Sequence, residues 1–232
     1  MDYTYKDMAK MIDHSLLNPT LTWGQLEAGC HLAVAYDVAS VCIMPYALSR
    51  CAELLSGSDV RASTTIGFPH GANTTTVKVA EAEQALREGG EELDMVANIS
   101  GVLSGRWDEV KVDIAAVTEV THAAGQKIKV IFENCYLNDE QKIRLCEICG
   151  ELNVDWVKTS TGYGTSGATD EDLKLMRANS PDHVQVKAAG SVRSLDRLIE
   201  VREFGVTRAG ATRTQEMMDE CRQRLQLEPI EI

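Results

Sequence analysis

The sequence has no long apolar run, no proline-rich stretch and no low-complexity segment. A membrane-spanning helix needs about 20 consecutive apolar residues, so the first absence argues against a membrane protein. The other two argue against a linker, and we expect residues 1–232 to form a single domain, a length typical of one α/β barrel. The first six residues also lack the basic and then apolar pattern of a secretory signal, which predicts a cytoplasmic protein.

Basic residues are scarce relative to acidic ones. There are 23 lysines and arginines against 35 aspartates and glutamates, which gives a net charge of -12. Nucleic-acid binding relies on positive charge, so the composition argues against a nucleic-acid partner. A small phosphorylated substrate remains compatible with it, because a few backbone amides or one arginine can bind an anion locally.

The cysteines do not form the pattern of a metal site or of a disulfide framework. They number seven and are scattered through helix-like and strand-like segments, as reduced buried thiols usually are. Cys146 and Cys149 have the spacing of a metal-binding pair, but no second pair or histidine lies nearby in the sequence. We therefore expect no metal site.

Strand-like and helix-like segments alternate from end to end, after an amphipathic opening at residues 5–11. The expected strands span residues 12–17, 39–44, 60–68, 92–97, 127–132, 155–159, 184–188 and 206–209. The expected helices span residues 22–35, 46–55, 74–88, 107–122, 138–149, 170–178, 194–204 and 212–225. Eight such units predict an α/β fold, a (β/α)8 TIM barrel with a short N-terminal helix. The alternative is an open doubly wound sheet, but no Gly-x-Gly-x-x-Gly turn follows the first strand.

Two of the expected strands end in a lysine. Lys158 opens into a turn rich in hydroxyls and glycine, and Lys187 is followed by small residues and Gly190. The two lysines are one strand–helix unit apart, so they should stand on neighbouring strands at the same end of the barrel. Two ammonium groups roughly 6 Å apart repel by on the order of 3 kcal/mol, which lowers one pKa by about two units. A lysine perturbed in this way can form a Schiff base, whereas an ordinary strand-end lysine simply extends into solvent.

Further polar residues lie at or near the carboxyl ends of the expected strands, where barrel active sites form. Asp94 lies within an apolar strand, so it is either the partner of a buried cation or a proton shuttle paired with Lys187. We expect the side chain of Cys42 to face the same end of the barrel, as a packing thiol rather than a reactive one. We expect His14 and His70 to form hydrogen bonds rather than to act as metal ligands. The other residues at these ends are Asp13, Phe68, Asn98, Glu133 and Asn134.

Seven segments of the chain resemble the class I deoxyribose-phosphate aldolases, in that family's order and across nearly the whole length. The resemblance implies a (β/α)8 barrel that reversibly joins acetaldehyde and glyceraldehyde 3-phosphate to 2-deoxyribose 5-phosphate, in deoxynucleoside catabolism. It also implies that Lys158 is the Schiff-base lysine, that Lys187 perturbs it, and that Asp94 is the proton-relay carboxylate. No cofactor is implied, and a homodimer is the family expectation. The matching segments are residues 12–17, 40–43, 66–71, 92–96, 129–133, 157–162 and 186–190.

Two turns depart from the pattern of that family, and both belong to the end of the barrel that binds phosphate. Residues 190–193 read Gly-Ser-Val-Arg where many members have paired glycines, and residues 210–213 read Gly-Ala-Thr-Arg in place of a Gly-x-Ser-Ser-like turn. We favour an Arg213 that points into the pocket, the alternative being a solvent-facing side chain. The other residues expected to contact substrate or phosphate are Cys42, Thr161, Gly190, Ser191, Gly210 and Thr212.

These features favour a cofactor-free, lysine-dependent aldolase that acts on a small phosphorylated sugar. The altered turns leave open an aldolase of the same barrel type with a different phosphosugar substrate. A barrel that binds a sugar phosphate without turnover is the third hypothesis, and trapping of a covalent imine distinguishes it from the other two.

Overall fold

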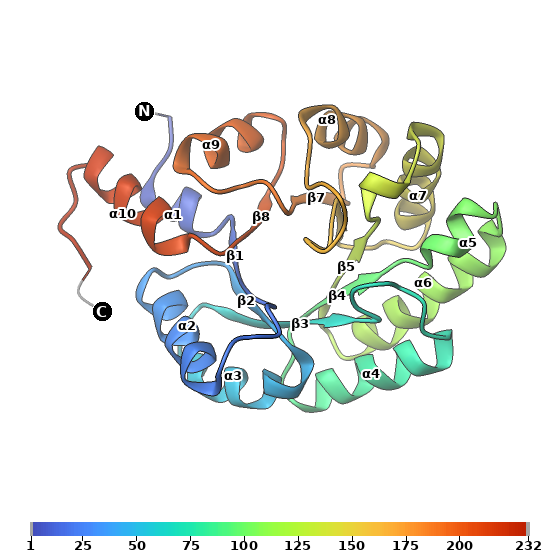
Figure 1. Ribbon diagram of the computed structural model, residues 1–232, viewed down its shortest axis with the longest axis horizontal. Helices are drawn as coiled ribbons and strands as arrows, with labels where there is room; N and C mark the ends of the chain where they lie inside the picture. The colour runs from blue at the N-terminus through green and yellow to red at the C-terminus, as the bar shows by residue number, and fades with distance from the viewer. Residues whose placement is uncertain (1, 231–232) are drawn as a thin grey trace.

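The protein forms a closed barrel of eight parallel strands that follow one another in chain order, as the computed structural model of residues 2–230 shows. Strand β8 pairs with β1 and closes the barrel. Figure 1 shows the helices arranged around this barrel. The prediction of a (β/α)8 barrel with a short N-terminal helix is therefore confirmed. The strands are β1 (Ile12–Leu16), β2 (Ser40–Ile43), β3 (Arg61–Ile66), β4 (Glu92–Val96), β5 (Lys127–Ile131), β6 (Trp156–Lys158), β7 (Gln185–Ala188) and β8 (Arg208–Ala211).

Side-chain caps define where several of the helices begin, including the longer ones that follow Thr22, Asn138, Thr169 and Ser194. Thr22 and Asn138 each accept a hydrogen bond from a backbone amide of the first turn, and both form capping boxes with a glutamine three residues later. The helices are α1 (Tyr5–Ala9), α2 (Trp23–Ala35), α3 (Leu48–Leu55), α4 (Thr75–Arg87), α5 (Ile99–Leu103), α6 (Trp107–Ala123), α7 (Asp139–Glu151), α8 (Asp170–Asn179), α9 (Leu195–Glu203) and α10 (Thr214–Arg224).

Among the differences from the sequence expectation are a helix that was not predicted and a shifted last strand. Helix α5, capped by Asn98, is only five residues long, too short to show a helical period of apolar residues. Strand β8 begins and ends two residues later than expected, because the amide of Val206 still bonds to the carbonyl of Val201 at the end of α9. The start of α10 moves to Thr214 as a result, which changes the position of Arg213.

The two faces of the barrel strands have different environments. In β4, Leu93 and Met95 face outward into the apolar core between strands and helices. The alternate residues Glu92 and Asp94 are buried on the other face, where they contact charged side chains of other strands. Branched apolar side chains usually fill the interior of such a barrel. Here part of the interior is instead a set of buried charges, which places polar chemistry at its centre.

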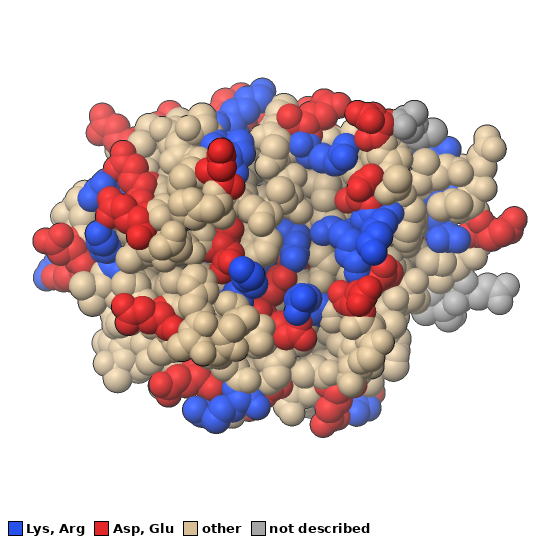
Figure 2. All heavy atoms as spheres, turned by 180° about the vertical axis from the view of Figure 1, so that it is seen from behind, with Lys and Arg blue, Asp and Glu red and all other residues tan. Residues whose placement is uncertain are grey.

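The molecular surface mixes the two charge signs. On the face drawn in Figure 2, lysines and arginines lie beside aspartates and glutamates. Exposed ion pairs of the molecule include Arg61–Glu91 at 2.5 Å and Arg50–Glu27 at 2.8 Å. Within residues 2–230, no helix combines the length and apolar character needed to cross a bilayer.

Candidate active site

Lys158 and Lys187 are direct neighbours across the β6–β7 pair, in register with one another. Their ammonium nitrogens both donate to the same oxygen of Asp94, Oδ2, at 2.7 Å each. All three side chains are almost fully buried. The expectation that the lysines stand side by side on neighbouring strands is confirmed. Asp94, expected to pair with a buried cation or with Lys187, accepts from both lysines.

The three groups differ in how their surroundings affect protonation. Burial lowers the pKa of Lys158, and the positive charge of Lys187 adds to this effect while Asp94 opposes it. Burial also disfavours the charged form of Lys187, but Asp13 and Asp94 outweigh it, so the pKa of Lys187 is raised. Burial acts to raise the pKa of Asp94, yet its cationic neighbours, Lys129 first among them, hold that pKa well below its usual range. Lys158 is therefore the amine that loses its proton most easily. Desolvation is the leading cause, whereas from the sequence a magnitude could be given only for the repulsion by Lys187.

Four further charged side chains that the sequence analysis did not recognise as part of the site lie around this trio. Asp13 was expected at the end of its strand, but it is the second residue of β1 and contacts Lys187 at 2.5 Å. Lys129 lies 2.9 Å from Asp94, and the remaining two are Glu92 and Arg208. Charged residues at alternate positions, Glu92 with Asp94 and Lys127 with Lys129, were the available sequence signal.

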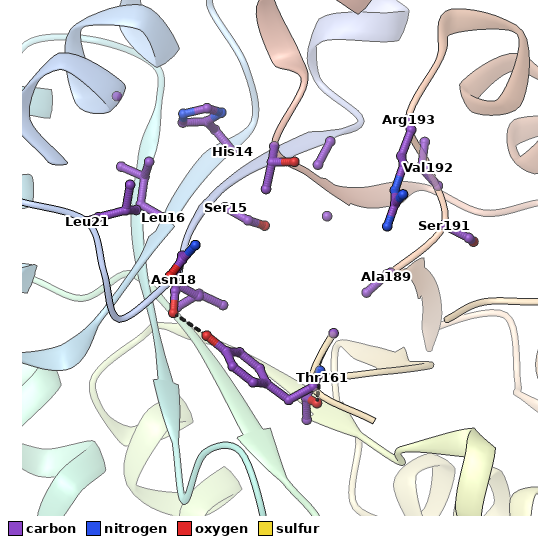
Figure 3. A pocket seen from close by; sticks show the side chains of 18 of the residues that line it. His14, Ser15, Leu16, Asn18, Leu21, Thr161, Ala189, Ser191, Val192 and Arg193 are labelled. Atoms are coloured by element: carbon purple, nitrogen blue, oxygen red, sulfur yellow. Dashed lines mark hydrogen bonds between the residues drawn. The ribbon is translucent and has the colours of Figure 1, made fainter. Parts of the chain in front are cut away.

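A pocket of about 850 Å³ opens at the carboxyl ends of the strands, and Lys158 is one of its lining residues. This volume suits a small ligand. Lys187 and Asp94 are covered, so among the three central groups Lys158 is the one that faces the pocket. The hydroxyl of Tyr163, from the loop after β6, donates to the carbonyl of Leu17 after β1 and spans one side of the opening (Figure 3).

Most of the residues expected to contact substrate or phosphate line the pocket, whereas Arg213 and Cys42 do not. Gly190, Ser191, Gly210 and Thr212 line the pocket, as does Thr161. Gly190 has a φ of +86°, and an added Cβ would lie 2.9 Å from the backbone of Gly167, so this turn requires glycine. The hydroxyl of Ser191 donates to the carbonyl of Ala168 at 2.7 Å, so the hydroxyl proton is already used in a hydrogen bond within the protein.

The expectation that Arg213 points into the pocket is wrong. Arg213 is the exposed N-cap residue of α10 and does not line the pocket. Two residues after the end of β8 the chain has already turned into α10, where the side chain of Arg213 is exposed. Arg193 lines the pocket instead, and its guanidinium extends toward the pocket interior in Figure 3. The sequence contained this signal, since Arg193 is the last residue of the altered turn at residues 190–193.

Cys42 does not belong to the pocket lining either. It is completely buried in β2, and burial, assisted by Asp94, raises the pKa of its thiol. This placement fits a packing thiol, and the expected substrate contact of Cys42 is not present.

His14 is a buried pocket residue whose Nδ1 lies 2.8 Å from Thr214 Oγ1. Burial lowers the pKa of His14 to about 4, so it is neutral at neutral pH. His70 is exposed. Among the described residues, no three histidine, cysteine, aspartate or glutamate side chains are grouped in a way that could hold a metal ion.

By its fold and its site, this is a (β/α)8-barrel protein with a partly desolvated lysine available for attack on a carbonyl group. Residues 7–213 match the model of the DeoC/LacD family of aldolases, and the chain belongs to that family. It is 67% identical over 231 residues to the deoxyribose-phosphate aldolase of Rhodopirellula baltica, an alignment that covers 100% of this chain and 96% of that protein.

Solved structures agree with this assignment. A putative deoxyribose-phosphate aldolase from Coccidioides immitis superposes with a TM-score of 0.91 at 33% identity, over 95% of this chain and 87% of that one. The deoxyribose phosphate aldolase of Aeropyrum pernix, described as a tetramer, superposes with a TM-score of 0.87 at 26% identity, over 96% and 93% of the two chains.

Proposed function

We propose that this protein is a class I deoxyribose-phosphate aldolase, which reversibly cleaves 2-deoxyribose 5-phosphate to acetaldehyde and glyceraldehyde 3-phosphate. The observation that carries the proposal is the position of Lys158, buried next to Lys187 and Asp94 and yet lining the pocket. The names of the relatives support the choice of substrate.

In the cleavage direction, the neutral amine of Lys158 attacks the aldehyde carbon C1 of the open-chain sugar and forms a carbinolamine. Loss of water gives an iminium ion. The iminium accepts the electron pair of the C2–C3 bond as that bond breaks, while the C3 hydroxyl loses its proton and becomes the aldehyde of glyceraldehyde 3-phosphate. Protonation of the resulting enamine at C2 and hydrolysis of the iminium then release acetaldehyde and regenerate Lys158.

In this scheme Lys187 donates a proton, and Asp94 holds the two amines in place. The raised pKa of Lys187 keeps it protonated near neutrality, so it is suited to donate to the departing hydroxyl of the carbinolamine. Asp94 stays ionised and accepts from both amines, which holds them in position for that transfer.

The phosphate group of the substrate would lie against the turn at residues 190–193. The guanidinium of Arg193 supplies a charge there, and backbone amides of a glycine-containing turn suit an anion. Because the hydroxyl of Ser191 is already bonded to Ala168, binding would depend on Arg193 and the amides rather than on that side chain. This arrangement keeps a different phosphosugar as the second candidate substrate.

The decisive experiment is borohydride reduction of the protein mixed with acetaldehyde. The wild type should gain the mass of one ethyl group, located on the peptide that contains Lys158. Lys158→Ala should lose both this label and turnover of deoxyribose 5-phosphate, whereas Lys174→Ala, which removes an exposed lysine, should keep both. A label on another lysine, or ordinary turnover by Lys158→Ala, would contradict the mechanism. A protein that binds the sugar phosphate without any label would instead be the non-catalytic barrel.

We further propose that the protein acts in the cytoplasm as a homo-oligomer. The tetramer described for the Aeropyrum pernix relative supports an assembly of identical chains, and the family resemblance implies a homodimer. Light scattering on the purified protein measures its mass. A dimer or a tetramer would support the proposal, and a monomer would contradict it.

A further inference from the structure

The barrel interior contains a network of seven charged side chains that extends beyond the residues of the proposed mechanism. We call it the buried charge cluster. Three members are the central trio described above, and four lie around it on β1, β4, β5 and β8. All but Arg208 are almost completely buried, and Arg208 is 13% exposed. The cluster consists of Asp13, Glu92, Asp94, Lys129, Lys158, Lys187 and Arg208.

The ion pairs of this cluster are unevenly distributed among its cations. Lys129 lies near three carboxylates, at 3.3 Å from Asp13, 2.6 Å from Glu92 and 2.9 Å from Asp94. Arg208 contacts two, Asp13 at 2.6 Å and Glu92 at 2.8 Å. Lys187 also contacts two, Asp13 and Asp94. Lys158 contacts Asp94 alone. Lys158 is thus the cation that the carboxylates stabilise least.

The charge balance of the cluster points to the same residue. With every member ionised, four cations face three carboxylates, which leaves one positive charge in excess. Excess charge is costly in an interior that water does not reach. Loss of one proton makes the cluster neutral, and the least stabilised cation is Lys158, which also lines the pocket.

From this geometry we infer that Lys129, Glu92 and Arg208 are positioning residues that set the protonation of Lys158 by acting through Asp94 and Lys187. None of the three lines the pocket. Lys129 and Arg208 fix the carboxylates by ion pairs, and the ring of Trp156 lies 5.8 Å from the Lys129 amine and 4.9 Å from the Arg208 guanidinium carbon. The inference rests on the proposed function, in which neutral Lys158 is the nucleophile. The other titratable neighbours, Cys42 and His14, carry no charge at neutral pH.

If the inference holds, removal of a cation from the cluster raises the pKa of Lys158, and removal of an anion lowers it. Lys129→Met removes a positive charge, so the cluster becomes balanced with Lys158 protonated, and the pKa of Lys158 should rise. Glu92→Gln removes a negative charge, so the pKa of Lys158 should fall. At a separation of about 7 Å and an effective dielectric of about 20, each shift should be roughly one to two pH units. The double variant should lie near the wild type.

The test measures the fraction of Lys158 acetylated by acetic anhydride as a function of pH, quantified by mass spectrometry. Acetic anhydride reacts with the neutral amine and requires no aldehyde. The measurement therefore remains informative even if imine trapping fails and the proposed function is wrong. Lys142→Met, which removes a buried lysine paired with Asp172 at 2.6 Å on the outer helices, should leave the Lys158 profile unchanged. Arg208→Lys keeps the charge and should also match the wild type, whereas Arg208→Met should shift the profile in the same direction as Lys129→Met.

Shifts of the same sign in Lys129→Met and Glu92→Gln, or no shift in either, would overturn the inference. A loss of activity with an unchanged acetylation profile would overturn it too, because that result is expected of residues with only a structural role. If Lys129→Met does not fold, Arg208→Met and Glu92→Gln provide the same test, because the first should raise the pKa of Lys158 and the second should lower it.

Discussion

Lys187→Leu removes the positive charge nearest to the proposed nucleophile. Both amines lie 2.7 Å from one oxygen of Asp94, so their nitrogens are at most twice that distance, 5.4 Å, apart. At about 5 Å and an effective dielectric of about 20, the repulsion between the two charges is about 3 kcal/mol, or about two pKa units. Asp94 also loses one cationic partner and interacts more strongly with Lys158. Both effects raise the pKa of Lys158.

The assay is the pH dependence of kcat/KM for deoxyribose 5-phosphate, whose acid limb reports the deprotonation of Lys158 in the free enzyme. In Lys187→Leu this limb should move toward alkaline pH by about two units. Lys187 also donates protons in the proposed mechanism, so the maximal rate should fall independently. The position of the limb, and not the height of the curve, tests the electrostatic argument.

Lys187→Arg is the matched control, because it keeps the positive charge while changing the proton donor. Its maximal rate should fall, but its acid limb should stay near that of the wild type. An unmoved acid limb in Lys187→Leu, with Lys158 still trapped by borohydride, would refute the claim that Lys187 lowers the pKa of Lys158.

Three further predictions concern other parts of the molecule. Arg193→Ala should lower kcat/KM for the phosphorylated sugar by about 10- to 100-fold and spare the unphosphorylated sugar, whereas Arg213→Ala should change neither, as parallel steady-state assays would reveal. Burial lowers the pKa of His14 to about 4, so as the pH falls the unfolded state takes up a proton before the folded state does. The free energy of unfolding should therefore drop by about 2 kcal/mol from pH 7 to pH 5. Urea titrations of His14→Gln should lack this drop. Asp113→Ala removes the carboxylate 2.6 Å from the fully buried Lys78 and leaves its charge with the neutral carbonyl of Val96 at 2.9 Å, so it should cost about 3–5 kcal/mol in denaturant unfolding. A much smaller loss would mean that Lys78 gains water or a further partner.

The sequence was sufficient to predict the order and approximate position of the barrel elements. Each strand–helix unit carries its own period of apolar residues, and caps such as Thr22 act within a few residues of the chain. The adjacency of Lys158 and Lys187 follows from the same regularity, because consecutive parallel strands end at the same edge. These are local properties or direct consequences of the repeat.

Elements and turns without a clear local signal were predicted less well. Helix α5 is too short for an apolar period, and the two-residue shift of β8 comes from a hydrogen bond between Val206 and Val201 that no pattern announces. Arg193 and Arg213 are each the last residue of an altered turn in the sequence, and only the three-dimensional course of the two loops distinguishes them.

The tertiary structure alone decided the electrostatics of the site. Asp94 contacts lysines 35, 64 and 93 residues away along the chain, and Arg208 joins Asp13 across 195 residues. The sequence identified the lysine pair as the cause of a perturbed amine, but the leading cause is the removal of water around Lys158. Burial and charge balance depend on which side chains from distant strands meet inside the closed barrel, and the energy of a charge depends on that surrounding space rather than on its neighbours in sequence.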